Sequence, residues 1–540
     1  MDRCESQPEV VDRDGPTAVA KRILPGDKEE KTIGDDFQWE YLEFDTSLPD
    51  FTTMISESSL IKPPNLQKYG NPFEWSRPQK NVTLFLCCIS TFLAAYGAGE
   101  YGFTGETLRS EWNLSLVAFE TGLTVFAFGF AIAPMFLAPF TEINGRRPVF
   151  LLSGLLLLIA TIGCAVTDSF AGMLIARLFA GIGSSTYSTI IGGVIADVWQ
   201  SKDRNVPMAV YSGFALGGTG MGPLISGIIC DRVSWRWVFY SHAISVAVVL
   251  CCQLLLFKET RGSILLSRRA KAINSYYDIL DEHTKQTGSP RVSPKIRYKV
   301  LADEQRQSLA EMLRVSLTRP FIMLSTEPVV FFFSLWAAFA WGVLYMTFNV
   351  LSLVFQARHN FTLTGQAGVF AAMVIGVIVA TLLSVYHERI AAKHLPGMSA
   401  SPEGRLYFTC IEAMLLPIGL FWFGWTSYSS IHWIVPTIAI GFATIGVYSV
   451  YLAVFNYLAD VYHRYASSAL AGQSFCRNTF GAVFPLFTSQ MFLALDFPGA
   501  SSLLGGIGLV LTLVPWVLVF KGPQIRARSK LASEIMSTAH

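Results

Sequence analysis

The chain has 540 residues, of which 52% are hydrophobic and 15% charged, with a mean hydropathy of +0.42 and a formal net charge of +2. Because soluble proteins carry about 25% charged residues, this composition excludes a water-soluble enzyme, a nucleic-acid-binding protein and a disordered scaffold. The nine cysteines form neither a CxxC pair nor a zinc-binding spacing, so we expect no disulfide framework and no metal site.

The first 78 residues are polar and acidic and contain no long apolar run. They match neither a signal peptide nor an Arg-rich transit peptide, and we expect a disordered cytoplasmic tail. Twelve apolar runs follow, each close to the roughly 20 residues that a helix needs to cross a bilayer. They lie at 82–101, 117–139, 148–168, 171–196, 208–230, 236–257, 321–347, 366–386, 406–427, 431–456, 468–492 and 502–520.

A polar, basic segment at 258–320 separates the first six runs from the last six. Within it, 305–317 is predicted to form an amphipathic helix on the membrane surface, and 282–299 to be a flexible linker. The sequence therefore predicts an all-α integral membrane protein with twelve transmembrane helices in two six-helix bundles. Lys and Arg gather in the central segment and near the C-terminus, so we expect both termini and this segment in the cytoplasm. The predicted units are residues 1–78, 79–257, 258–320, 321–521 and 522–540.

Few ionisable residues fall within the predicted spans, where each costs about 2.5–3.5 kcal/mol to insert. Arg177 precedes Gly181, Ser184, Ser188 and Gly192, which share one helix face. We predict that this small, polar face lines a water-filled path and that Arg177 holds a carboxylate partner. The alternative, an arginine that extends to the cytoplasmic surface, is disfavoured because Arg177 lies in the outer half of its span.

Three carboxyl groups are candidates to carry a proton, because apolar surroundings raise the pKa of a carboxyl group. These are Glu327 and Glu412, with Glu100 as a further candidate. For Glu327 the alternative is a helix-end acid bonded to a neighbouring loop. His242 and His432 lie near outer ends of spans, where we expect them to reach the membrane surface.

The fifth span is rich in glycine. Gly218, Gly222 and Ser226 repeat at four-residue spacing, which lets two helices approach closely. Pro223 removes a backbone hydrogen bond and permits a bend, and Gly227 follows one turn later. Tight packing without any role in gating is the alternative.

Aromatic and polar residues also fall where a central cavity would lie between the bundles. Such walls suit amphipathic organic molecules, although each aromatic residue could instead face lipid. The candidate cavity residues are Tyr187, Trp341, Tyr345, Asn349, Tyr448, Tyr451, Gln473 and Arg477.

Taken together, these features resemble the major facilitator superfamily and, within it, the twelve-span drug:proton antiporters of fungi, over about residues 70–520. The segment 138–148 is similar to the signature loop of the family, although Ala138 and Ile143 depart from it. The fourth and fifth spans are similar to two further family motifs, with Ala180 and Ser226 as departures.

The resemblance implies two bundles that rock about a central site to give alternating access. It implies that Arg177 couples to proton movement and that the Gly-Pro bend in the fifth span seals the interface between the halves through Gly218, Gly222, Pro223 and Gly227. It also implies a latch of ion pairs that holds the cytoplasmic ends together in the outward-facing state, although the basic pair could serve topology alone. The latch residues are Glu142, Gly145, Arg146, Arg147 and Asp197.

The chain contains no GxxxxGK[ST] motif, which disfavours ATP as the energy source. We therefore expect a monomeric secondary transporter of the plasma membrane that exports amphipathic organic molecules by proton antiport, without a cofactor. Its partners would be the small-molecule substrate, protons and the lipid bilayer. Two alternatives stay open: a narrow-substrate carrier or facilitator of polyamines or organic acids, and a non-transporting solute sensor. An enzyme is disfavoured because His387-Glu388 lacks the second histidine of an HExxH motif.

Overall fold

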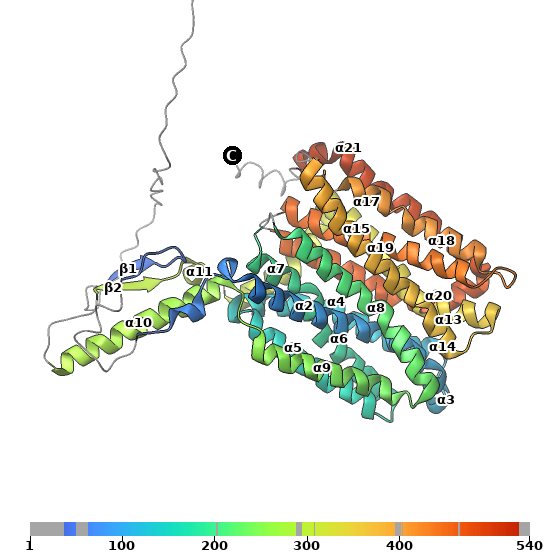
Figure 1. Ribbon diagram of the computed structural model, residues 1–540, viewed down its shortest axis with the longest axis horizontal. Helices are drawn as coiled ribbons and strands as arrows, with labels where there is room; N and C mark the ends of the chain where they lie inside the picture. The colour runs from blue at the N-terminus through green and yellow to red at the C-terminus, as the bar shows by residue number, and fades with distance from the viewer. Residues whose placement is uncertain are drawn as a thin grey trace, which may run out of the picture.

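Long helices make up most of the computed structural model, and they run side by side in two groups (Figure 1). The structure describes residues 37–49, 63–200, 203–287, 294–306, 308–394, 401, 403–404, 406–462 and 465–528. The first group is formed by α2 (Arg77–Gly99), α3 (Gly105–Trp112), α4 (Leu116–Asn144), α5 (Arg146–Val166), α6 (Phe170–Thr189), α7 (Ile191–Val198), α8 (Asn205–Arg232) and α9 (Arg236–Leu256). The second is formed by α13 (Pro328–His359), α14 (Leu363–Val369), α15 (Ala371–His394), α17 (Leu406–Glu412), α18 (Leu415–Thr426), α19 (Ile434–Tyr462), α20 (Ala466–Leu511) and α21 (Leu513–Arg528).

Eleven described helical segments are long and apolar enough to cross a membrane. The last of them, Ala466–Ala527, has 62 residues, about 90 Å of helix against a hydrocarbon core of about 30 Å. Asp496 interrupts it with a non-helical backbone (φ 54°, ψ 167°), so this segment crosses twice. The predicted all-α architecture with twelve spans is confirmed.

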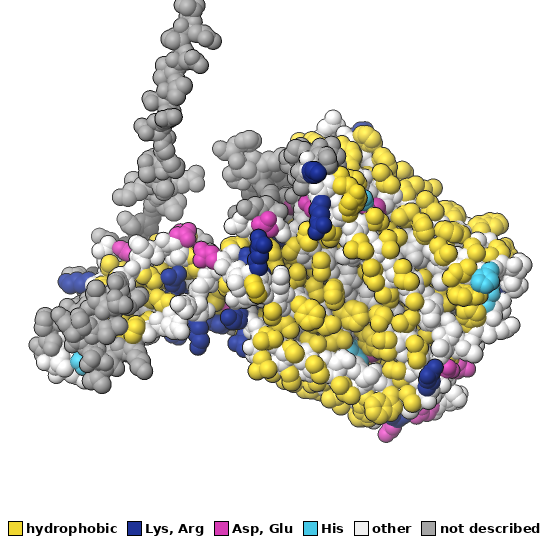
Figure 2. All heavy atoms as spheres, viewed as in Figure 1, with side chains coloured by type: hydrophobic (Ala, Val, Ile, Leu, Met, Phe, Trp, Pro, Cys, Tyr) yellow, Lys and Arg dark blue, Asp and Glu magenta, His cyan; other side chains and the backbone are white. Residues whose placement is uncertain are grey.

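Polar side chains fix where several of these helices begin. The hydroxyl oxygens of Ser115, Ser169 and Thr362 each accept a hydrogen bond from a backbone N–H in the first turn of the helix that follows. Hydrophobic side chains cover the helical body, whereas charged ones gather at its ends (Figure 2). Such a surface requires a lipid environment.

Packing divides the helices into halves that meet along a shared interface. In the first half α2 packs against α8, and α4 against α6; in the second α13 packs against α20, and α18 against α19. Contacts of α4 with α20, and of α8 with α14 and α15, join the halves. The seventh span begins at Pro328 rather than at the predicted residue 321, because α12 (Leu309–Thr326) ends before Glu327.

A small unit lies outside the helical body, on the left in Figure 1. Strand β1 (Gln38–Tyr41) pairs in parallel with β2 (Ile296–Lys299), with Gln38 opposite Ile296, and β2 packs against α10 (Gly262–Thr287). We call β1, β2 and α10 the clasp, and the end of the helical body beside it the clasp end. Its core consists of Leu42, Ala270, Ile273, Tyr276, Tyr277, Leu280, Tyr298 and Val300.

The clasp corrects two predictions about the polar segments. Residues 38–41 were expected in a disordered tail, yet they form β1, and the short helices η1 (Leu66–Tyr69) and η2 (Pro72–Glu74) follow. The expected linker 282–299 contributes the end of α10 and all of β2. The predicted surface helix 305–317 is wrong in its limits, because α12 begins at Leu309 and continues to Thr326. Residues 1–36, 50–62 and 529–540 of the predicted tails lie outside the described residues.

Candidate functional site

A buried cluster of ionisable groups lies within the first half. The guanidinium of Arg177 lies 3.7 Å from a carboxylate oxygen of Glu100, and the ring Nδ1 of His242 lies 3.0 Å from the same carboxylate. All three side chains are at most 2% exposed. Arg177 donates to the carbonyl oxygen of Gly97 at 2.7 Å, and its guanidinium lies 4.4 Å from the ring centre of Phe126.

Glu100 is the carboxylate partner that was predicted for Arg177. The sequence did not indicate that Glu100 or His242 pairs with Arg177. His242 is buried against Glu100, not placed at the membrane surface as expected. One oxygen of Glu100, one nitrogen of Arg177 and Nε2 of His242 have no hydrogen-bond partner in the described part of the chain. Ionisable side chains buried together within a membrane-spanning bundle are costly to insert and mark a candidate functional site.

A second cluster joins helix ends at the clasp end. Arg146 pairs with Asp197 at 3.1 Å, and its backbone N–H donates to the carboxylate of Glu259 at 2.8 Å. Gly145 has φ +93°, and a Cβ at this position would lie 2.2 Å from Glu259. Glycine is therefore required here both for the backbone conformation and for the close approach of the carboxylate.

The residues that pair here are not all those of the predicted latch. Arg147 donates to the carbonyl oxygen of Leu254, and Arg146, not Arg147, pairs with Asp197. Glu142 is exposed, and no ion pair of its side chain occurs among the described residues. The missed residue is Glu259, which lies two residues beyond the predicted end of the sixth span, at the same end as the basic loop. Its place at the same end of the bundle as Arg146 could have indicated that the two residues lie close together.

The glycines of α8 lie on two different faces. A Cβ at Gly218 would lie 2.3 Å from the carbonyl oxygen of Phe92, and one at Gly222 would lie 2.5 Å from that of Tyr96, so this face packs on α2 within the first half. A Cβ at Gly227 would lie 2.5 Å from Ala367 of α14, in the second half. Pro223 also faces α2, at Gly99. Of the predicted sealing residues, the structure thus places Gly227 between the halves.

Three of the predicted cavity residues form an aromatic cluster beside a fourth, the cation Arg477. The guanidinium carbon of Arg477 lies 4.5 Å from the ring centre of Trp341 and 5.0 Å from that of Tyr451. The rings of Trp341 and Tyr451 are stacked with centres 5.6 Å apart, and Tyr345 lies beside Trp341. Tyr211 of α8 contacts Tyr451, which brings the first half to the cluster.

The other predicted cavity residues lie apart from this cluster or at its margin. Tyr187 donates to the carbonyl oxygen of Phe150 at 2.7 Å and so faces α5 inside the first half. Tyr448 donates to the carbonyl oxygen of Ala209 at 2.9 Å, across the interface between the halves. Asn349 lies beside Glu120, and Gln473 is buried on α20.

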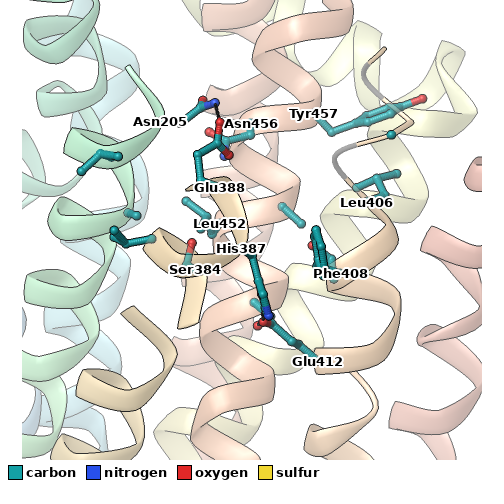
Figure 3. A pocket seen from close by; sticks show the side chains of 17 residues that line it. Asn205, Ser384, His387, Glu388, Leu406, Phe408, Glu412, Leu452, Asn456 and Tyr457 are labelled. Carbon is teal, nitrogen blue, oxygen red and sulfur yellow. Dashed lines mark hydrogen bonds and ion pairs between the residues drawn. The ribbon is translucent and has the colours of Figure 1, made fainter. Parts of the chain in front are cut away.

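Glu412 lines a cavity of about 90 Å³ at the clasp end (Figure 3). Its carboxylate lies 2.9 Å from His387 and accepts a hydrogen bond from Ser449 at 2.5 Å. In the same cavity Asn205 of α8 donates to Glu388 of α15 at 2.6 Å, which ties the two halves together (Figure 3).

Glu327 caps the start of α13 and is buried. Tyr462 of α19 donates a hydrogen bond to its carboxylate at 3.2 Å. Glu327 is therefore a helix-end acid, as in the alternative, but the partner seen here belongs to a helix and not to a loop. Among the described residues no group of three or more His, Cys, Asp or Glu side chains is arranged to hold a metal ion.

Comparisons with known proteins agree with this architecture. The sequence pattern of the Major Facilitator Superfamily matches residues 87–485. The multidrug transporter mdrA of Aspergillus fumigatus is 34% identical over 469 residues, which is 86% of this chain and 74% of that protein. The transporter paaT of Penicillium rubens is 33% identical over 86% of this chain and 82% of its own length. The multidrug transporter FLU1 of Candida albicans is 30% identical over 87% and 76% of the two chains.

Solved structures show the same fold at low sequence identity. The proton:xylose symporter XylE superposes with a TM-score of 0.56 at 16% identity, covering 82% of this chain and 97% of its own. A transporter of the POT family superposes with a TM-score of 0.57 at 16% identity, covering 86% and 100%. From its helices, its sequence pattern and these relatives, the chain belongs to the major facilitator superfamily, as a multi-pass membrane protein related to fungal multidrug and efflux transporters.

Proposed function

We propose that this protein is a secondary active transporter that exports amphipathic organic molecules by proton antiport through alternating access. The single observation that carries the proposal is the buried carboxylate of Glu100, held between Arg177 and His242. One proton moving through 100 mV releases about 2.3 kcal/mol, and one pH unit adds about 1.4 kcal/mol. A proton bound at this carboxylate weakens its ion pair with Arg177.

The two-half arrangement supports the conformational part of the proposal. At the clasp end the halves are joined by the Asn205–Glu388 hydrogen bond, and at the opposite end by a hydrogen bond from Thr364 to Asp231 at 2.6 Å. Small numbers of such polar contacts can form and break as one half rocks against the other. We infer that the cluster of Arg146, Asp197 and Glu259 stabilises one of the two positions.

We further propose that the protein is a monomer of the plasma membrane with both termini in the cytoplasm. The support for this orientation is the concentration of Lys and Arg at the clasp end and in the clasp itself. A small-molecule substrate, protons and lipid are then the partners. The multidrug and efflux transporters among the relatives support export as the direction of transport.

The test is proton-driven movement of fluorescent amphipathic dyes in sealed vesicles that contain the purified protein. We expect an imposed pH gradient to drive accumulation, and the Glu100→Gln variant to lose this gradient dependence. Arg236→Gln is the matched control, because Arg236 forms partly exposed ion pairs away from the cluster. Dye movement that ignores the gradient would show a facilitator, and an absence of movement would favour the sensor.

A further inference from the structure

Among the described residues, one buried arginine has no acidic side chain as a counter-charge. Four arginines are less than 9% exposed among the described residues. Arg146 pairs with Asp197, Arg177 with Glu100, and Arg297 with Asp278 and Asp281. Arg477, at 3% exposed, has no ion pair and donates no side-chain hydrogen bond within the described ranges. Arginine stays protonated inside proteins, so this charge needs another means of stabilisation.

The aromatic rings around Arg477 stabilise only part of that charge. Trp341 and Tyr451 lie against the guanidinium with their ring centres 4.5 and 5.0 Å from its central carbon. Cation–π contacts of this kind are weaker than the cost of removing an unpaired charge from water. The two ring centres lie only 5.6 Å apart, so both rings lie on the same side of the guanidinium. Its Nε, which has no partner among the described residues, can still donate to a hydrogen-bond acceptor.

Two donors at this place lack acceptors. Nε of Arg477 and Nε1 of Trp341 are both buried and have no partner in the described part of the chain. A carboxylate accepts two hydrogen bonds from one arginine, and a third donor beside it satisfies a further lone pair. Gly481, one turn after Arg477, lets the rings of Trp341 and Tyr345 approach α20, since a Cβ there would lie 3.2–3.4 Å from them.

The cluster also lies at the depth where transporters of this architecture bind their substrates. Arg477 follows the start of α20 by 11 residues, and Tyr451 precedes the end of α19 by 11, which is about 17 Å of helix. Half of the hydrocarbon core is about 15 Å. Tyr211 of the first half contacts Tyr451, so the cluster lies at the interface that would open and close.

We propose that Arg477 binds the carboxylate of the transported molecule, so that the substrate class is a lipophilic organic acid in its anionic form. This inference rests on the proposed function. The hydrophobic part of the acid packs against Trp341, Tyr345 and Tyr451, and the carboxylate supplies the counter-charge of Arg477. Without a bound acid, the charge of Arg477 is stabilised among the described residues by the rings of Trp341 and Tyr451.

The test compares matched acids and amides on the full-length protein purified in detergent. The probes are benzoate and benzamide, 2-naphthoate and 2-naphthamide, and pyrenebutyrate and pyrenebutyramide, titrated by calorimetry at pH 7, where the carboxyl groups are ionised. We expect at least one acid to bind about 10- to 100-fold more tightly than its amide, as charge-assisted hydrogen bonds provide. Arg477→Gln should remove this preference, whereas Arg236→Gln, away from the cluster, should keep it.

Equal affinity of each acid and its amide for the unmodified protein would overturn the proposal, and so would a preference that persists in Arg477→Gln. The comparison on the unmodified protein does not depend on whether the variant folds. Arg477→Lys keeps the charge but not the paired donors, and we expect it to retain part of the preference. The result is also separable from proton coupling: gradient-driven dye export without any acid preference refutes only the anionic substrate.

Discussion

Gly227 offers a way to change the balance between conformations with a single methyl group. A Cβ at this position would lie 2.5 Å from the Cβ of Ala367 and 3.0 Å from the ring of Phe103. Carbon atoms in contact are normally about 3.5–4.0 Å apart, so Gly227→Ala requires α8 and α14 to separate by roughly 1 Å or more. Ala367 has no flexible side chain that could move aside.

The cost of such overpacking is about 1–3 kcal/mol, which corresponds to roughly a 5- to 150-fold change in the ratio of two conformations. Since the contact exists only while the halves are closed at the end opposite the clasp, Gly227→Ala should favour the form that is open there. Spin labels at Ser234 and Ala357, on exposed positions of the two halves at this end, would report the change by double electron–electron resonance. We expect the distance distribution to shift towards longer values.

Gly218→Ala is the matched control, because its Cβ would lie 2.3 Å from the carbonyl oxygen of Phe92 within the first half. It should lower the melting temperature without moving the distance distribution, since both residues belong to the same half. The reasoning is refuted if Gly227→Ala leaves the distribution unchanged, or if Gly218→Ala shifts it equally.

Three further predictions follow from contacts elsewhere. Glu100→Gln leaves a buried arginine without its acid, so we expect a loss of about 3–5 kcal/mol in unfolding free energy, and a thermal melt that matches the unmodified protein would contradict this. Gly145→Ala would place an alanine at a backbone φ of +93° and its Cβ against Glu259, so we expect the unfolding free energy to fall by at least about 1–3 kcal/mol. A thermal melt checks this, with Gly506→Ala as the control, because a Cβ there meets no neighbour within 4 Å. The hydrogen bond from Lys299 lowers the pKa of Glu304, so this contact stabilises the clasp above the unfolded-state pKa of Glu304 and stops doing so as pH falls through the folded-state pKa. Proteolysis of the clasp should therefore increase at acidic pH in the unmodified protein. Glu304→Gln should show the same susceptibility already at neutral pH.

The sequence predicted the helical architecture well because length and apolar content are strong signals. Each run of about 20 apolar residues requires a helix in lipid. The largest errors in position fall at the seventh span, which begins at Pro328 because α12 takes up the apolar run before it, and which continues to His359 beyond the predicted residue 347. Arg177 was predicted to need an acid for the same reason, since an unpaired charge in the interior is costly.

The partners of the charged residues were harder to predict, because they depend on which helices pack together. Glu100 and His242 are separated by 142 residues in the chain, yet their side chains meet. The pairing of Asp197 with Arg146 rather than Arg147 is decided by which side of α5 faces α7, and neighbouring basic residues in a loop carry no information about that. Strand β1 is four residues long and pairs with a strand more than 250 residues later, so neither its length nor a nearby partner could indicate it.

The pairing of β1 with β2 has a consequence for how the protein is made. These strands flank the first half in the chain, so the whole of that half and its clasp are complete once Lys299 has been synthesised. The 241 residues that follow Lys299 in this sequence (540 minus 299) take roughly 10–50 s to translate at about 5–20 residues per second. During that time the first half can insert into the membrane and fold, and β1 can pair with β2, while the ribosome is still synthesising the second half. The clasp can therefore form, and the first half can fold completely, before the second half has been synthesised.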